Sequence, residues 1–323
     1  MLSDGWAIVL NLVSIQLLGL LAATTLLALL FGFLQDQIST LSARSQKTAL
    51  WLFVLSPWLI SVICAITCFP SLFQTSSSGM LSWLTHWHSP YEFHLGSWHS
   101  LKLLLFTIVV VYFVLRKLWQ AVRHIHALDT LAGLSSQQSS QSIGDDVVIL
   151  QAPQPLAFAS GLLKPKCFLT SGLIQQLTEQ ELAIVIAHER AHICHKDGIK
   201  KWLFTLLAAL YPAGITQQLQ SQFSMATELL ADARVSRRFS PFDVAQTLIK
   251  AARLQRRYGL DIAASANTFV ANDVDQRVRA LIIPSAGRAF PWLPSLALLL
   301  LTTLFCSVAV DVLHHFIELF LTH

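Results

Sequence analysis

Four long apolar runs dominate the pattern of hydrophobic and polar positions along the chain. They extend from Gly5 to Leu34, from Thr48 to Phe73, from Leu101 to Trp119 and from Ala289 to Val310. A helix needs about 20 mostly apolar residues to cross a bilayer, so each run predicts a membrane span. Pro57 and Pro70 are expected to kink or end the second span. The first run follows no basic segment and is too long for a cleaved signal peptide, so it also predicts a span.

The segment between the third and fourth runs has the mixed pattern of a folded domain. A polar, low-complexity stretch at 135–142 is interpreted as a linker. After it, Val147–Leu150 and Lys166–Thr170 are short apolar runs flanked by Pro and Gly, which predicts two strands. An exposed strand edge in such a domain is a natural place for an extended peptide to bind by strand addition.

Helices are predicted for the rest of this segment. Thr178 and Glu181 have the spacing of a capping box, so a helix is expected to begin there and to continue through the apolar residues that follow. Trp202 to Ile215 is apolar but short and interrupted by Pro212. We expect it to pack beneath the site, and a dip into the membrane face is the alternative. Pro241 to Arg279 predicts an amphipathic helical cover leading to the fourth span.

Composition places these elements in a membrane. Of the 323 residues, 54% are hydrophobic and only 12% are charged, and the mean hydropathy is +0.57. These values exclude an ordinary soluble domain. The formal net charge is +4. Because a group of basic residues lies at the predicted inner membrane edges, this charge requires no direct contact with nucleic acid.

The basic residues also predict the orientation of the spans. The first residues, the loop 74–100 and the tail after Val310 contain no Lys or Arg. Cytoplasmic loops carry an excess of Lys and Arg, so both termini are expected outside the cytoplasm and the folded domain inside it. The basic residues near the predicted cytoplasmic ends of the spans are Arg44, Lys47, Arg116, Lys117, Arg123, Arg277, Arg279 and Arg288. We therefore expect a three-span region at 1–126, a cytoplasmic domain at 127–288 and a fourth span with a short tail at 289–323.

The candidate chemistry lies in the sequence His188-Glu189-Arg190-Ala191-His192. On a helix, His188 and His192 project from one face, so both imidazoles can bind one Zn²⁺. Glu189 lies beside them and is placed to accept a proton from water. This division of labour is typical of H-E-x-x-H metallopeptidases, so Glu189 is expected to be catalytic.

A catalytic zinc takes three protein ligands, so one more is needed. Glu228 and Asp232 are four residues apart and share one face of a predicted helix. Glu228 is the expected third ligand, and Asp232 the expected carboxylate that orients a ligand histidine and supports catalysis. His195 is the alternative third ligand, but three ligands on consecutive turns of one helix strain a tetrahedral site. A core helix with histidines that bind no metal is the remaining interpretation.

The order of these features resembles the BlaR/MecR family of membrane zinc metallopeptidases, which are antirepressor transducers. The spans, the H-E-x-x-H domain and the downstream glutamate helix follow the family's order over nearly the whole chain. The local matches are Phe158-Ala159-Ser160-Gly161-Leu162-Leu163-Lys164-Pro165, Leu177-Thr178-Glu179-Gln180-Glu181-Leu182, His188-Glu189-Arg190-Ala191-His192 and His195-Lys196-Asp197.

The resemblance implies an α-helical protein of the bacterial inner membrane with about four spans and a cytoplasmic α+β zinc peptidase domain of the gluzincin type. It also implies that the substrate is a cytoplasmic transcriptional repressor or the chain itself. Receptors of the family continue into a penicillin-binding sensor domain, whereas this sequence ends at His323. Sensing of beta-lactams is therefore not expected.

Other interpretations remain open. A quality-control protease of the HtpX type shares the H-E-x-x-H motif and the downstream glutamate, and a non-catalytic membrane scaffold with structural zinc is the weakest alternative. The loop 74–100 is rich in His and Trp. A metal or pH sensor and an interfacial aromatic belt both account for that composition.

Overall fold

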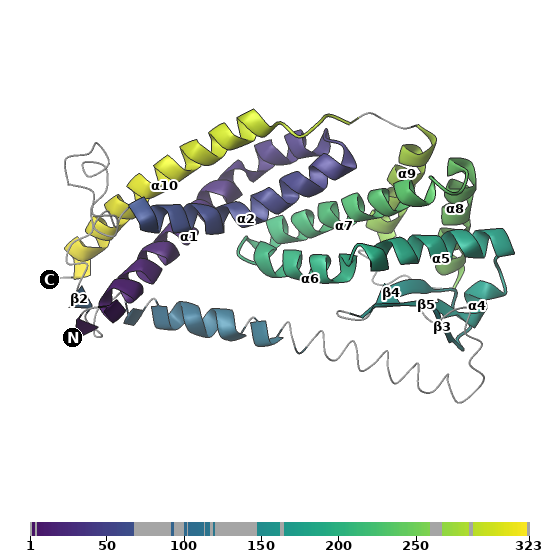
Figure 1. The fold of residues 1–323 in the computed structure, drawn as a ribbon, viewed down its shortest axis with the longest axis horizontal. Helices are drawn as coiled ribbons and strands as arrows, with labels where there is room; N and C mark the ends of the chain where they lie inside the picture. The colour runs from purple at the N-terminus through teal and green to yellow at the C-terminus, as the bar shows by residue number, and fades with distance from the viewer. Residues whose placement is uncertain are drawn as a thin grey trace.

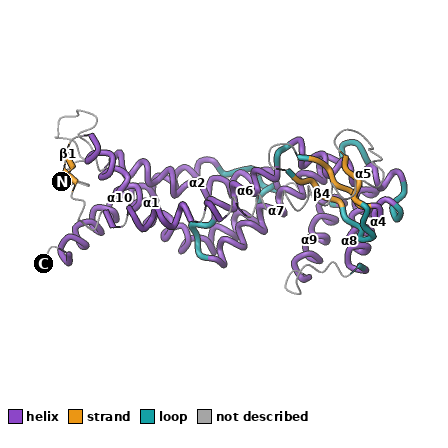
Figure 2. The backbone as a smooth tube through the Cα atoms, turned by 90° about the horizontal axis from the view of Figure 1, so that it is seen from below, coloured by secondary structure: helices purple, strands orange, loops and turns teal. Residues whose placement is uncertain are grey.

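The computed structural model of the protein describes most of the chain. The described residues are 2–3, 5–67, 92–93, 100–101, 103–112, 114–116, 119, 147–161, 165–258, 267–283 and 287–321. The predicted linker 135–142 and all of the loop 74–100 except 92–93 and 100 lie outside them, as does Pro70. The molecule is elongated, with a helical bundle at one end and a small sheet at the other (Figure 2).

Three helices make up the bundle, namely α1 (Gly5–Ser39), α2 (Ala43–Thr67) and α10 (Trp292–Leu321) (Figure 1). Within the described residues, these three are long and apolar enough to cross a membrane. They match the first, second and fourth predicted spans. Between Leu103 and Arg116 the described residues form a shorter apolar helix, so the count of four spans stays a prediction. Pro57 lies inside α2 and does not end it.

Close packing joins the bundle helices. A Cβ on Gly19 of α1 would lie 3.1 Å from the Cα of Ser61 in α2, so the two backbones approach closely at this crossing. Near the sheet end, Ser42 N donates to Arg288 O at 3.0 Å and Arg288 N donates to Thr40 O at 3.2 Å. A Cβ on Gly287 would lie 2.5 Å from Ser42 N. Glycine is therefore required where the segment leading to α10 passes the start of α2.

The folded domain contains a three-stranded sheet of β3 (Val147–Leu150), β4 (Ala157–Ser160) and β5 (Lys166–Thr170). The strand order is β3-β5-β4, with β3 parallel and β4 antiparallel to β5. The two strands predicted from the sequence are confirmed as β3 and β5, and β4 is an additional edge strand. The short helix α4 (Ser171–Ile174) follows β5, and a separate two-residue pairing joins β1 (Leu2–Ser3) to β2 (Glu92–Phe93).

Helix α5 (Glu179–Cys194) packs on the sheet. Its residues Leu182, Val185 and Ile186 contact a buried cluster that includes Cys167 and Leu169 of β5. This packing holds the H-E-x-x-H segment, which is part of α5, in a fixed position relative to the edge strand β4. The predicted α+β character of the domain is therefore visible in the structure.

The hairpin of α6 (Asp197–Ala208) and α7 (Ala213–Val235) joins the domain to the bundle. Phe204 and Phe223 belong to the same buried cluster as residues of α1 and α2. At the tip of the hairpin, the Tyr211 hydroxyl donates to the Phe53 carbonyl of α2 at 3.0 Å. The apolar segment from Trp202 to Ile215 therefore packs against a membrane-type helix over most of its length.

Two helices cover the opposite side of the domain. The predicted amphipathic stretch from Pro241 to Arg279 forms α8 (Pro241–Arg257) and α9 (Asn267–Ile282), with the intervening residues outside the described part. Val244 of α8 and Leu281 of α9 are buried against Ile184 of α5. The helix that carries the motif is thus enclosed by the sheet, by the hairpin and by these two helices.

Candidate metal centre

Helix α5 begins where the spacing of Thr178 and Glu181 predicts its first turn. The Thr178 hydroxyl accepts from Glu181 N at 3.3 Å, and Thr178 N donates to the Glu181 carboxylate at 2.8 Å. The predicted capping box is therefore confirmed. At the other end, Lys196 adopts the left-handed conformation with φ of 52°. This residue ends the α5 segment and lets α6 begin at Asp197 in a new direction.

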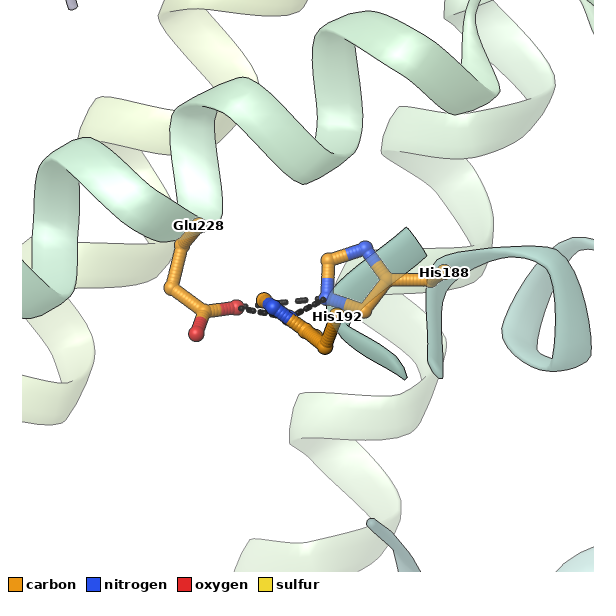
Figure 3. A group of neighbouring side chains, drawn as sticks. All are labelled: His188, His192 and Glu228. Atoms are coloured by element: carbon orange, nitrogen blue, oxygen red, sulfur yellow. Dashed lines mark hydrogen bonds and ion pairs between the residues drawn. The ribbon is translucent and has the colours of Figure 1, made fainter. Parts of the chain in front are cut away.

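Three side chains from α5 and α7 converge on one point (Figure 3). His188 Nε2 lies 3.1 Å from His192 Nε2 and 3.2 Å from Glu228 Oε2, and His192 Nε2 lies 3.5 Å from Glu228 Oε2. Ligands about 2.0–2.2 Å from a tetrahedral zinc are separated from one another by roughly 3.3–3.6 Å. The spacing and the donor types of these three residues therefore fit Zn²⁺ or a similar divalent ion.

Each histidine is held by a carboxylate on its other ring nitrogen. His188 Nδ1 lies 3.0 Å from Asp232 Oδ1, and His192 Nδ1 lies 3.0 Å from Asp197 Oδ2. A hydrogen bond from Nδ1–H to a carboxylate fixes the tautomer and leaves the Nε2 lone pair for a metal. The structure thus places the carboxylate of Asp232 in contact with His188. Asp197 has no role among the sequence-based expectations.

Arg277 of α9 completes the polar surroundings. Its Nε and Nη2 donate to the two oxygens of Asp232 at 2.7 and 2.9 Å, and Nη1 lies 3.5 Å from Glu228 Oε2. In the sequence, Arg277 is informative only as one of the basic residues that predict the orientation of the spans. Arg277 lies 45 residues after Asp232 and on a different helix. No helical periodicity therefore connects the two residues in the sequence.

These contacts shift the pKa values of the cluster. Burial acts to lower the pKa of His188, but its hydrogen bonds to Asp232 and Glu228 outweigh burial and raise the pKa to about 9. For His192 burial also acts to lower the pKa, and bonds to Asp197 and Glu228 raise it overall. The pKa of Glu228 lies well below its ordinary value, because the two histidines outweigh its burial. A metal that enters this site must therefore displace a proton.

Glu189 lines the same cavity as the three converging residues. The cavity has a volume of about 760 Å³ and is bounded by β4 and by α5 to α9. One wall carries the polar cluster, and another is apolar, formed by side chains such as Ile184, Val244 and Leu248. This arrangement places a carboxylate next to a metal-type site in a space large enough for part of a peptide chain.

The alternative third ligand does not reach the cluster. His195 follows the last residue of α5, and its Nδ1 lies 3.0 Å from the carbonyl of Ala191. Glu228, by contrast, is close to both histidines, and its second oxygen accepts from Lys201 Nζ at 3.2 Å. Among the described residues, His188, His192 and Glu228 are the group whose ligand atoms lie close enough to hold a metal ion.

Fold and site together define a membrane-type protein with a helical domain built around an H-E-x-x-H metal centre. Residues 122–282 match the family described as Peptidase family M48, a family of zinc metalloproteases, so this segment belongs to that family. The matched range includes the whole polar cluster, α5 to α9 and the sheet.

Two curated relatives match a shorter stretch. A Protease HtpX homolog of Caldanaerobacter subterraneus subsp. tengcongensis is 39% identical over 67 residues, which is 20% of this chain and 22% of the relative. Protease HtpX of Idiomarina loihiensis is 35% identical over 68 residues, which is 20% of this chain and 24% of the relative. The chain therefore matches less than a quarter of the length of either relative.

Proposed function

We propose that the protein is a membrane-bound zinc metalloendopeptidase in which His188, His192 and Glu228 hold the metal and Glu189 is the general base and acid. The observation that carries the proposal is the convergence of two histidines and a glutamate beside Glu189, with a carboxylate on the Nδ1 of each histidine. The residues proposed for the roles of metal-assisted peptide hydrolysis all line one cavity, which supports the proposal.

In this mechanism, His188, His192 and Glu228 would hold Zn²⁺, which would supply Lewis acidity for the activation of water and of the scissile carbonyl. Glu189 accepts the proton of the attacking water and delivers it to the nitrogen of the leaving amine. Asp232 and Asp197 keep His188 and His192 in the tautomer that binds metal. Arg277 fixes the carboxylate of Asp232 through two hydrogen bonds.

The substrate is proposed to bind as an extended strand along β4. In the described sheet β4 is an edge strand, and its residues from Ala157 to Ser160 line the cavity that contains Glu189. A peptide paired with this edge gains backbone hydrogen bonds without a requirement for a particular sequence. Its side chains then reach the apolar wall of the cavity that includes Val244 and Leu248.

The protein is proposed to reside in the bacterial inner membrane with the peptidase domain in the cytoplasm and both termini outside it. Arg44 and Lys47 lie at the start of α2, and Arg288 lies beside that start. These basic residues are at the end of the bundle that faces the peptidase domain. Strand β1 and the end of α10 lie at the opposite end (Figure 1), as the distribution of basic residues predicts.

The proposed role is cleavage of a cytoplasmic repressor or of the chain itself in signal transduction. The order of spans and motifs shared with the BlaR/MecR family supports this role. Quality control of membrane proteins is the second candidate, supported by the names of the two HtpX relatives. A non-catalytic scaffold with structural zinc is the third interpretation, and the position of Glu189 in the cavity opposes it.

The variant Glu189→Gln tests the activity. We expect the purified full-length variant to retain about one zinc per chain and to lose cleavage, whereas Glu228→Ala loses the zinc as well. Undiminished cleavage by Glu189→Gln contradicts the mechanism.

In the native host, labelling of protein N-termini in wild type and Glu189→Gln distinguishes the signalling role from the quality-control role. One or a few Glu189-dependent products that include a DNA-binding protein favour signalling, and a broad set of membrane-protein fragments favours quality control.

A further inference from the structure

Lys47 lies at the start of the membrane-type helix α2, and its ammonium group reaches into the peptidase domain. Its Nζ lies 3.1 Å from Oδ1 of Asp197, a residue 150 positions later in the sequence. The side chain of Lys47 is 15% exposed and that of Asp197 only 2%. Most ion pairs between exposed side chains contribute little, but this one is shielded from water on both sides.

The other oxygen of Asp197 contacts the metal centre. Asp197 Oδ2 lies 3.0 Å from His192 Nδ1, so the carboxylate bridges the ammonium of Lys47 and the ring of His192. A carboxylate that accepts from a ligand histidine determines the orientation of that ring. Since Lys47 holds the opposite oxygen, it limits the rotation of the carboxylate.

A second contact joins Lys47 to the helix that carries Glu228. Its Nζ lies 5.3 Å from the centroid of the Phe223 ring in α7, within the range of a cation–π interaction. Trp51, four residues after Lys47 in α2, packs edge-on against both Phe204 of α6 and Phe223, at centroid distances of 5.5 and 5.6 Å. One face of α2 therefore packs against both α6 and α7, the two helices that follow the motif.

We propose that Lys47 is a positioning residue for the metal centre, which acts through Asp197 on His192 and ties the placement of α2 to the affinity of the site for its metal. Without the ammonium group, the buried carboxylate of Asp197 keeps only one of its two side-chain partners, the ring of His192. Its carboxylate is then less firmly held against His192. The proposal rests on the proposed function, because it takes His192 to be a metal ligand.

The test is the affinity of the full-length protein for Zn²⁺ in detergent or nanodiscs, measured by competition with a chelator. Removing a group that contacts a ligand histidine typically lowers metal affinity by about 10–100-fold. Lys47 is one residue further from the metal, so we expect Lys47→Met to weaken zinc binding about 10-fold. We expect Lys47→Arg, which keeps the charge, to restore most of the affinity.

Three further variants separate this role from a general structural one. Lys250→Met breaks another lysine–carboxylate pair, to Glu181 at 2.6 Å, away from the cluster, and should leave zinc affinity unchanged. Asp197→Asn should weaken binding at least as much as Lys47→Met. The double variant should be no weaker than Asp197→Asn alone, because both changes act on one carboxylate.

Wild-type zinc affinity in Lys47→Met, or an additive loss in the double variant, overturns the proposal. If Lys47→Met fails to fold, Lys47→Gln and Lys47→Arg provide the same comparison.

The absorption spectrum of the Co²⁺-loaded protein gives a second readout, since altered geometry at His192 changes the ligand-field bands of the cobalt. If the wild type itself binds no zinc, the proposed function fails. If it binds zinc that Lys47 does not influence, only the present proposal fails.

Discussion

Arg277 donates two hydrogen bonds to the carboxylate of Asp232, at 2.7 and 2.9 Å, while Asp232 Oδ1 lies 3.0 Å from His188 Nδ1. The arginine therefore compensates the charge of a buried carboxylate that must face a histidine. The Asp232 side chain is only 4% exposed, so its charge is balanced mainly by the arginine and little by water.

We predict that Arg277→Met destabilises the metal-free protein by about 3 kcal/mol, because it leaves a buried carboxylate without its cation. Thermal unfolding of the full-length protein in detergent measures the change. Arg279→Met is the matched control, since Arg279 pairs with Asp275 at 2.8 Å on the exposed side of the same helix. An exposed pair of this kind contributes about 0.3–0.5 kcal/mol. Equal losses in the two variants would contradict the prediction.

Zinc affinity is predicted to rise with pH. His188 has a pKa raised to about 9 in the metal-free protein because Asp232 and Glu228 stabilise its charged form against the effect of burial. Zinc binds the deprotonated ring, so proton competition weakens as the pH increases towards that pKa. Chelator competition between about pH 6 and pH 9 measures the slope. A flat profile would show that no proton is displaced.

The metal-free protein should show the opposite trend in stability. A pKa raised from 6.5 to about 9 makes the folded state bind the proton more tightly than the unfolded state. The stabilisation is fully present below pH 6.5 and is lost as the pH rises through about 9. Denaturant unfolding of the metal-free protein at about pH 6 and pH 9 tests this sign, and His188→Asn should reduce the difference.

The capping box of α5 should contribute to stability without affecting the chemistry. Thr178→Ala removes the hydroxyl that accepts from Glu181 N, at an expected cost of about 1 kcal/mol. Zinc affinity should be unchanged, because the cap lies ten residues before His188 in the sequence. A loss of zinc binding that matches the loss of stability would show that the two ends of α5 are more tightly coupled than we infer.

The apolar wall of the cavity is predicted to limit the size of the substrate side chain that can bind. Ala251 of α8 lines the cavity, so Ala251→Phe should raise KM for a peptide substrate at unchanged zinc content. Gln246→Phe is the control, because it adds the same ring at an exposed position of the same helix. An equal rise of KM in both variants would argue against binding of substrate at this wall.

Local patterns in the sequence were sufficient for the elements and for part of the site. The apolar runs predicted α1, α2 and α10, because the length and the lack of charge of a span are properties of a single segment. The spacing of Thr178 and Glu181 predicted the start of α5. The four-residue spacing of His188 and His192 predicted a shared helix face, since helical periodicity is also local.

Glu228 and Asp232 could be selected because a zinc site needs a third ligand and an orienting carboxylate, and their spacing also places both on one face. Their approach to the histidines, however, depends on how α7 packs against α5. The sequence contains no periodicity that links helices separated by a turn.

Tertiary structure alone decided which side chains Asp197, Arg277 and Lys47 contact. Asp197 faces His192 only because the left-handed Lys196 turns the chain between α5 and α6. Arg277 and Lys47 reach the centre from α9 and α2, which are brought together by the buried apolar faces of the domain and the bundle. Hydrophobic burial is non-directional, so the pattern of apolar residues predicts which faces are covered, whereas the neighbours of each charged group depend on the packing of the whole chain.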